Sequence, residues 1–181
     1  MARLPLITSK DQIDPKDHAI ADSIMESRGT LQGPFMAFLH CPELAGRLAH
    51  LGAFVRFEGS LDMRVRVLAA MTVAREFEAL YVWGAQTGSA RRQNVPESTI
   101  DAIRDNHERG IPLDDAAIVT FTRQLLRKHR VDDASANALR ARFGDDGFIQ
   151  LTGAIGYYSM LAMTVNAAEL DAAPGAEVLK V

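Results

Sequence analysis

Residues 59–85 read GSLDMRVRVLAAMTVAREFEALYVWGA. After Asp62 the run is rich in alanine, leucine, valine and methionine, and these apolar residues fall on several faces of a helix. Ser60 or Asp62 can cap the first turn, because a short oxygen-bearing side chain accepts a hydrogen bond from the free backbone amides there. The stretch therefore predicts a long buried helix at the centre of the core.

The segments around it also carry helical signals. From Pro42, residues 42–57 place Leu44, Leu48, Leu51 and Val55 at spacings of three and four, which predicts a helix with one apolar stripe. Acidic residues near the start, and basic residues or glycine near the end, predict further helices. These span residues 94–106, 113–129, and 132–144 with Gly144 as a C-terminal cap. Residues 147–170 are nearly uncharged until Glu169, which predicts a last, buried helix. No segment sustains the alternation of a strand, so the predicted fold class is all-α.

Length and charge limit the class of protein. The 181 residues fit one domain, which we divide into an N-terminal arm with a short helix at 1–30 and a helical domain at 31–181. The net charge of −3 supplies no basic surface, so we predict no nucleic-acid partner and no membrane partner. The start of the chain is too short in apolar length for a signal peptide, and no run approaches about 18 uncharged apolar residues. A single cysteine excludes an intramolecular disulfide and fits a cytoplasmic location.

Motifs for cofactors and metals are missing from the sequence. It has no glycine-rich phosphate loop, no CxxC pattern, and no two histidines three or four residues apart. We therefore predict no cofactor and no dedicated metal site. His40 and Cys41 are neighbours, which allows a reactive thiolate or a small buried thiol. Sequence neighbours rarely reach the geometry of a Cys–His couple, which favours the second alternative.

Residues 64–103 read RVRVLAAMTVAREFEALYVWGAQTGSARRQNVPESTIDAI and resemble the carboxymuconolactone decarboxylase family. The V-A-R at 73–75, the Y-x-W at 81–83 and the closing GYYSMLAMTVN at 156–166 agree with the family pattern in order and distance. With its flanks, the resemblance covers most of residues 31–168. It implies an alkylhydroperoxidase-like helical bundle that assembles as a homo-oligomer, a trimer or a hexamer, with its pocket close to the subunit contacts.

The ionisable residues of the family motif are replaced in this chain. The resemblance implies a cysteine pair at positions 79 and 82 in the peroxidase branch, with a glutamate at 67 and a histidine at 86; decarboxylase-like members have a glutamate at 82. This sequence has Ala79, Val82, Val67 and Gln86. A glutamine amide donates and accepts hydrogen bonds but does not titrate near neutral pH, so Gln86 can orient a carboxylate, lactone or carbonyl group and cannot be a general base. The two valines make the predicted pocket drier.

The same positions give the predicted site. On a continuous helix, residues 78, 82 and 86 share one face, which makes Glu78 the nearest carboxylate. We predict as catalytic residues Gln86, Glu78 and Tyr81, and as substrate-binding residues Val67, Val82, Trp83 and again Gln86. Two alternatives stay open: Glu78 is a solvated carboxylate, and Tyr81 and Trp83 serve core or subunit packing.

Three functions are compatible with these residues. The first is a cofactor-free, non-redox lyase or isomerase, decarboxylase-like, that acts on a small carboxylated or lactone ring compound of the kind met in aromatic compound catabolism. The second is a non-catalytic, oligomeric ligand-binding or scaffold protein of the same fold, so whether the chain is an enzyme stays open. The third, a thiol peroxidase, needs a thiolate nucleophile and a resolving thiol, and the lone Cys41 disfavours it.

Overall fold

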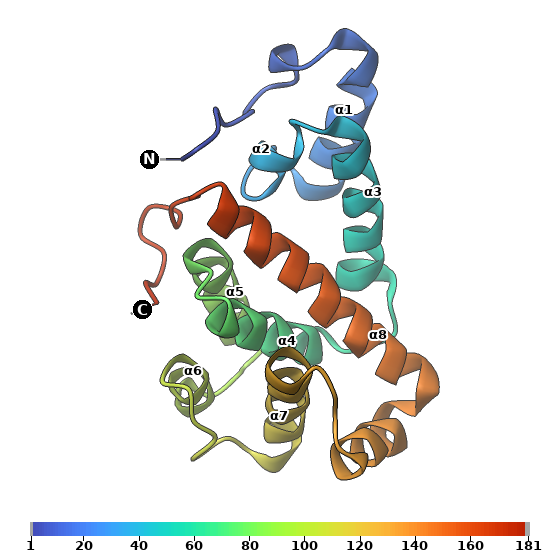
Figure 1. Cartoon of the computed structure of the whole chain (residues 1–181), viewed down its shortest axis with the longest axis vertical. Coiled ribbons are helices and arrows are strands. Elements are labelled where there is room, and N and C mark those ends of the chain that lie inside the picture. Colours follow the sequence, from blue (N-terminus) through green and yellow to red (C-terminus); the bar gives the residue numbers. More distant parts are fainter. Residues whose placement is uncertain (1, 180–181) are drawn as a thin grey trace.

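The computed structural model describes residues 2–179, and within that range it is helical with no β-strand (Figure 1). The prediction of an all-α fold is confirmed. The α-helices are α1 His18–Arg28, α2 Phe35–Phe38, α3 Pro42–Ala53, α4 Met63–Glu76, α5 Leu80–Arg92, α6 Glu97–Arg104, α7 Leu113–Lys128 and α8 Asp133–Ala167. Helix α3 continues into a π-helical turn, Phe54–Glu58, and two short 3-10 turns, Lys10–Gln12 and Pro15–Asp17, precede α1.

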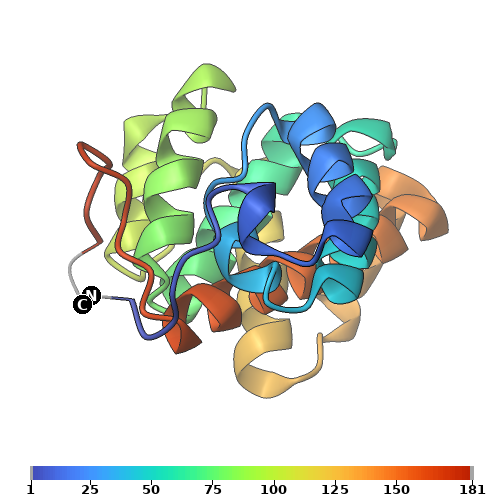
Figure 2. The same ribbon diagram turned by 90° about the horizontal axis from the view of Figure 1, so that it is seen from above.

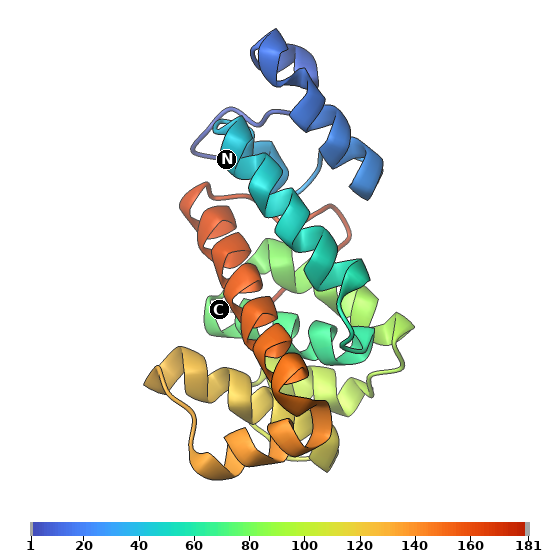
Figure 3. The ribbon, with the colours of Figure 1, turned by 90° about the vertical axis from the view of Figure 1, so that its right-hand side faces the viewer.

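Helix α4 forms the centre of the core, as the opening stretch predicts. The side chain of Asp62 accepts a hydrogen bond from the Arg64 backbone amide at 2.7 Å, which caps the helix start. Every residue from Val67 to Ala74 is buried, because α4 packs against α5, α7 and α8. In Figure 1, α8 runs obliquely across the molecule, with α1 and α3 toward one end and α4 to α7 toward the other; Figure 3 shows the same division from the side.

Helix α8 consists of two straight sections that meet at Gly144. This residue has φ 69° and ψ 178°, a backbone conformation that glycine adopts without steric cost, so the predicted helix end at Gly144 is confirmed. By length and composition α8 would suffice to cross a bilayer. In its most apolar window, 44% of the residues are buried against the rest of the chain.

The prediction of a continuous helix through residues 77–79 is wrong. Helix α4 ends at Glu76, and Glu78 takes a left-handed conformation with φ 52°. The Ala79 amide then donates to the Ala74 carbonyl at 2.8 Å, the hydrogen bond of a glycine-type helix cap, although no glycine is present. Asn166 of α8 donates to the Phe77 carbonyl at 2.6 Å and holds the turn.

The apolar stripe predicted on the helix after Pro42 is only half buried. Leu48 and Val55 lie in the core, whereas Leu44 and Leu51 are 44% and 42% exposed. Helix α3 turns its small residues, Ala45, Ala49 and Gly52, toward the core instead. The two exposed leucines therefore leave an apolar edge on α3.

The ends of the chain pack onto the helices. In the N-terminal arm, the Ile7 amide donates to the Met36 carbonyl at 3.0 Å, and the Ile7 side chain joins the same core as the rest of the chain. The C-terminal tail after α8 runs beside α5 (Figure 2), where Glu177 forms an ion pair with Arg91 at 2.6 Å. The division at residue 30 stays a prediction.

Candidate functional site

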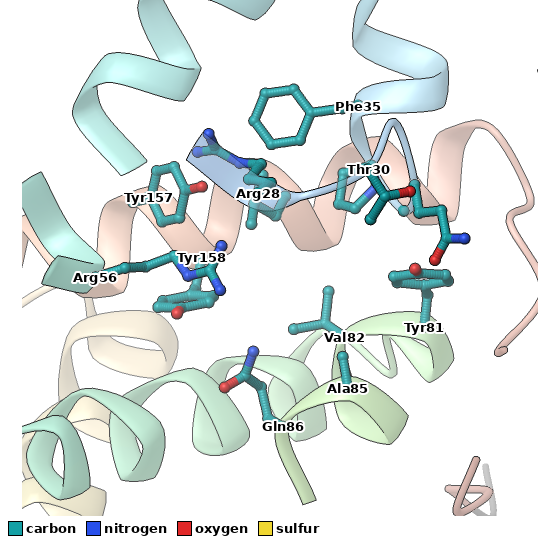
Figure 4. A pocket seen from close by; sticks show the side chains of 14 residues that line it. Arg28, Thr30, Phe35, Arg56, Tyr81, Val82, Ala85, Gln86, Tyr157 and Tyr158 are labelled. Carbon is teal, nitrogen blue, oxygen red and sulfur yellow. The ribbon is translucent and has the colours of Figure 1, made fainter. Parts of the chain in front are cut away.

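A cavity of about 260 Å³ lies between the end of α1, the loop 29–34, the π-helical turn, α5 and α8 (Figure 4). We call it the arginine cavity, because Arg28 and Arg56 both line it. Apolar and aromatic side chains make up much of the remaining wall. They are Pro34, Phe35, Val82, Ala85, Tyr81, Tyr157, Tyr158 and Leu161.

One face of α5 forms the floor of the arginine cavity. Tyr81, Val82, Ala85 and Gln86 line it, at the spacings that place residues on one side of a helix. Gln86 is partly buried, and within residues 2–179 its amide makes no hydrogen bond. The amide is therefore free to bind a ligand.

Arg56 reaches the arginine cavity from the π-helical turn. The wide i to i+5 hydrogen bond from the Gly59 amide to the Phe54 carbonyl, 2.8 Å long, closes this turn, a geometry that is frequent at functional sites. Arg66 on α4 donates to the Val55 carbonyl at 2.8 Å and so fixes the backbone next to Arg56. The Arg56 guanidinium lies 4.8 Å from the centre of the Phe57 ring, and no carboxylate among the described residues pairs with it.

Arg28 approaches from the last residue of α1. It donates to the Ala49 carbonyl at 3.1 Å and stacks 4.4 Å from the centre of the Phe35 ring, while its Nε is buried without a hydrogen-bond partner. Gly52 makes this position possible, because a Cβ there would stand 2.7 Å from Arg28 Nη2 and would also collide with the Tyr157 hydroxyl.

The electrostatics of the arginine cavity favour an anion. Of the described residues that line it, two are arginines and none is a carboxylate, a histidine or a cysteine. Burial raises the pKa of Tyr158 to about 12, an effect that the nearby Arg56 charge opposes. Burial also raises the pKa of Tyr81. Both tyrosines are therefore neutral phenols at neutral pH and can donate hydrogen bonds or a proton.

The structure brings together only some of the predicted site residues. Gln86, Tyr81 and Val82 line the arginine cavity. Val67 and Trp83 do not line it and are buried in the core, with exposed fractions of 2% and 0%. Their predicted contact with substrate does not fit this placement.

Glu78 lies away from the arginine cavity. Because α4 ends before it, Glu78 is exposed in the turn between α4 and α5, where its carboxylate stands 3.7 Å from Arg75 Nη1. It lines a separate surface depression with Glu169 and Asp171. The shared helical face that suggested Glu78 as the nearest carboxylate is therefore not present.

The remaining chemistry-bearing residues lie outside the arginine cavity. Cys41 is an exposed free thiol at the start of α3, so the favoured alternative of a small buried thiol is wrong. Within residues 2–179, no group of three or more His, Cys, Asp or Glu residues is arranged to hold a metal ion.

Sequence reasoning missed Arg28, Arg56, Tyr157 and Tyr158. Each had a weak local signal: Arg28 directly precedes Gly29, which ends α1, and Arg56 stands between aromatic residues in FVRF. Tyr157 and Tyr158 are adjacent in a nearly uncharged helix. Nothing in the sequence places these signals together.

Comparisons with known proteins concern the fold. No family model matches the chain, and no curated protein matches it. Solved structures do match. An uncharacterized peroxidase-related protein from Ralstonia eutropha JMP134, with the core fold of the alkylhydroperoxidase AhpD, gives a TM-score of 0.78 at 16% sequence identity, over 96% of this chain and 93% of that chain.

Two further structures are similar. A variant of the debrominase Bmp8 in complex with 2,3,4-tribromopyrrole has a TM-score of 0.74 at 14% identity, over 96% of this chain and 95% of that chain. An uncharacterized peroxidase-related protein from Silicibacter sp. TM1040 also gives 0.74 at 14% identity, over 96% and 94%. The chain therefore has the predicted alkylhydroperoxidase-like fold. Identities this low establish the fold and not the activity.

Proposed function

We propose that this chain binds a small anionic ring compound in the arginine cavity and decarboxylates it as a cofactor-free, non-redox lyase. The observation that carries the proposal is the pairing of two guanidinium groups with the free Gln86 amide in a largely apolar cavity without a carboxylate. Guanidinium groups recognise carboxylates and other oxyanions, and an uncompensated partly buried charge gains most from such a partner. A cavity of about 150 Å³ holds benzene, so about 260 Å³ accommodates a substituted single ring.

The missing base favours a lyase over an isomerase. Moving a proton along a carbon chain requires a base to remove it, whereas a decarboxylation begins with cleavage of the carbon–carboxylate bond. The electron pair of that bond moves onto a conjugated carbonyl oxygen, CO₂ leaves, and the resulting enolate takes up a proton. Gln86 or a guanidinium can stabilise the developing enolate oxygen, and the neutral Tyr81 or Tyr158 can donate the proton to carbon and recover it from water.

A second candidate is a ligand-binding protein without turnover. The missing base also favours this candidate. Among the described residues that line the cavity, the arginines and the tyrosines are the only titratable side chains. The fold supports either candidate, since the debrominase Bmp8 holds a substituted five-membered ring, 2,3,4-tribromopyrrole. A thiol peroxidase is not proposed, because Cys41 lies outside the cavity.

The test separates binding from turnover. Benzoate binding is measured by isothermal titration calorimetry, and a panel of carboxylated lactones is then followed by ultraviolet absorbance and CO₂ release. Release of CO₂ with loss of lactone absorbance supports the lyase. Binding without CO₂ release supports the ligand-binding protein, and failure of benzoate and of every lactone to bind overturns both.

Replacing Gln86 tests its role in orienting the ligand. We expect Gln86→Met, which keeps the side-chain length and removes the amide, to weaken benzoate binding by about tenfold, the effect of losing one buried hydrogen bond to a charged group. The melting temperature should not change, because the amide makes no hydrogen bond within residues 2–179. Calorimetry and a thermal melt measure the two quantities. A lower melting temperature with unchanged affinity would show instead that Gln86 only supports the fold.

We also propose that the chain forms a homo-oligomer, a trimer or a hexamer, in the cytoplasm. Large apolar side chains are exposed on the edge formed by α3 and the π-helical turn, and along the outer side of α8. Large apolar side chains that are exposed near one another on a surface favour a protein interface. These residues are Leu44, Leu51, Phe54 and Phe57 on the edge, and Ile149, Met160 and Met163 on α8.

A further inference from the structure

A second cavity of about 410 Å³ adjoins the arginine cavity. It lies between the N-terminal arm, the loop 29–34 and the C-terminal tail at 171–174, and we call it the tail cavity. Four residues line both cavities, so the two share a wall. These residues are Thr30, Gln32, Gly33 and Tyr81.

Tyr81 and Gly33 form the narrow part of this wall. Gly33 has φ 70°, and a Cβ at that position would stand 2.8 Å from the Tyr81 hydroxyl, so the phenol rests directly against the loop backbone. Within residues 2–179, no hydrogen bond fixes the Tyr81 hydroxyl. Figure 4 shows Tyr81 at the end of the arginine cavity away from Arg56. Tyr81 therefore lies between the two cavities and is not held in place by a hydrogen bond among the described residues.

The tail cavity has a different chemistry from the arginine cavity. Its wall is mostly apolar, with Leu31, Met36, Ala172 and Pro174, and none of the described residues that line it is cationic. Asp171 is the one charged residue among the described residues of this wall. An anionic group is thus attracted to the arginine cavity and repelled from the tail cavity, whereas a hydrocarbon chain gains free energy by leaving water for the tail cavity.

We propose that the substrate is an elongated anion, with its charged ring in the arginine cavity and an apolar chain of several carbons that passes Tyr81 into the tail cavity. This inference rests on the proposed function, because it takes the arginine cavity as the site of the anionic ring. It adds the substrate class: a ring carboxylate with an alkyl substituent rather than a compact one.

The length of the alkyl group on the ligand tests this proposal. Dissociation constants of the full-length protein for benzoate, 4-propylbenzoate and 4-hexylbenzoate are measured by calorimetry. Each buried methylene should strengthen binding by about two- to fourfold, so the three additional methylenes of the hexyl compound should make it bind about 8- to 64-fold more tightly than the propyl compound. Two separate variants, Ala172→Trp and Thr8→Trp, each place a tryptophan in the tail cavity. Each should remove most of the affinity gained from the alkyl group and leave benzoate binding unchanged.

The matched control is Ala138→Trp, an exposed position near the start of α8 that lines neither cavity, and it should keep the full gain. Thermal melts show whether Ala172→Trp and Thr8→Trp are folded, and one folded variant of the two is enough for the test. If benzoate binds but the longer chains add nothing, the elongated substrate is overturned while the proposed function stands. The elongated substrate is also overturned if a folded tryptophan variant still binds the longer alkylbenzoates more tightly than benzoate. If none of the three compounds binds, the proposed function fails and the inference fails with it.

Discussion

Replacing Trp83 by alanine is expected to lower the free energy of unfolding by about 3–5 kcal/mol, the range for removing a fully buried aromatic side chain. Trp83 is 0% exposed and is the largest of the fully buried side chains. Its loss would leave a cavity on α5 that close-packed neighbours cannot fill. Chemical denaturation followed by circular dichroism measures the change.

The control for this variant is Trp83→Phe. The Trp83 Nε1 is buried without a hydrogen-bond partner, so removing it sacrifices no bond and the phenylalanine variant should retain most of the stability. This pair of variants also decides between the two alternatives for Trp83. If Trp83 is a packing residue, its replacement lowers the stability. If it binds substrate, its replacement changes benzoate affinity at constant stability, and that result would contradict the placement of Trp83 in the core.

Replacing Arg56 by alanine is expected to weaken benzoate binding by about 10- to 150-fold, which corresponds to about 1.5–3 kcal/mol for a hydrogen bond to a charged group. The loss should exceed that of Gln86→Met, because the guanidinium supplies charge as well as hydrogen bonds. Stability should not fall, since Arg56 has no carboxylate partner within residues 2–179 whose charge would be left unpaired.

Arg142→Ala is a matched control for Arg56→Ala. Arg142 stacks on the ring of the next residue, Phe143, at 4.7 Å, as Arg56 does on Phe57 at 4.8 Å, but Arg142 lines neither cavity. It should leave benzoate affinity unchanged. Equal losses from both variants would mean that the effect is a general one of net charge, and the assignment of Arg56 to the ligand would then be wrong.

The helices were predictable from the sequence because their signals are local. Asp62, Pro42 and Gly144 act within one turn of the helix ends that they mark, and each behaves as predicted. The turn between α4 and α5 was not predictable in this way. It is held by Asn166, which lies 89 residues from its partner Phe77, and its left-handed position is occupied by Glu78 where glycine is the usual residue.

In the candidate site, too, the residues with local sequence signals were predictable and those brought together by remote contacts were not. Gln86, Tyr81 and Val82 come from one helix, so a single motif and its periodicity locate all three. The rest of the wall is assembled from three elements that are remote in sequence: Arg28 on α1, Arg56 on the π-helical turn, and the neutral tyrosines on α8. No period in the sequence connects these elements, because the packing of α8 across the molecule brings them together.

The lone exposed thiol, Cys41, provides a way to measure how subunits are arranged. As the one cysteine of the chain, it takes a maleimide spin label at a single known position at the start of α3, outside both cavities. Pulsed dipolar spectroscopy then reports the separation of labels on neighbouring copies. A cyclic trimer has one such distance, a hexamer has several, and a monomer has none. A featureless decay at micromolar concentration would contradict the proposed assembly.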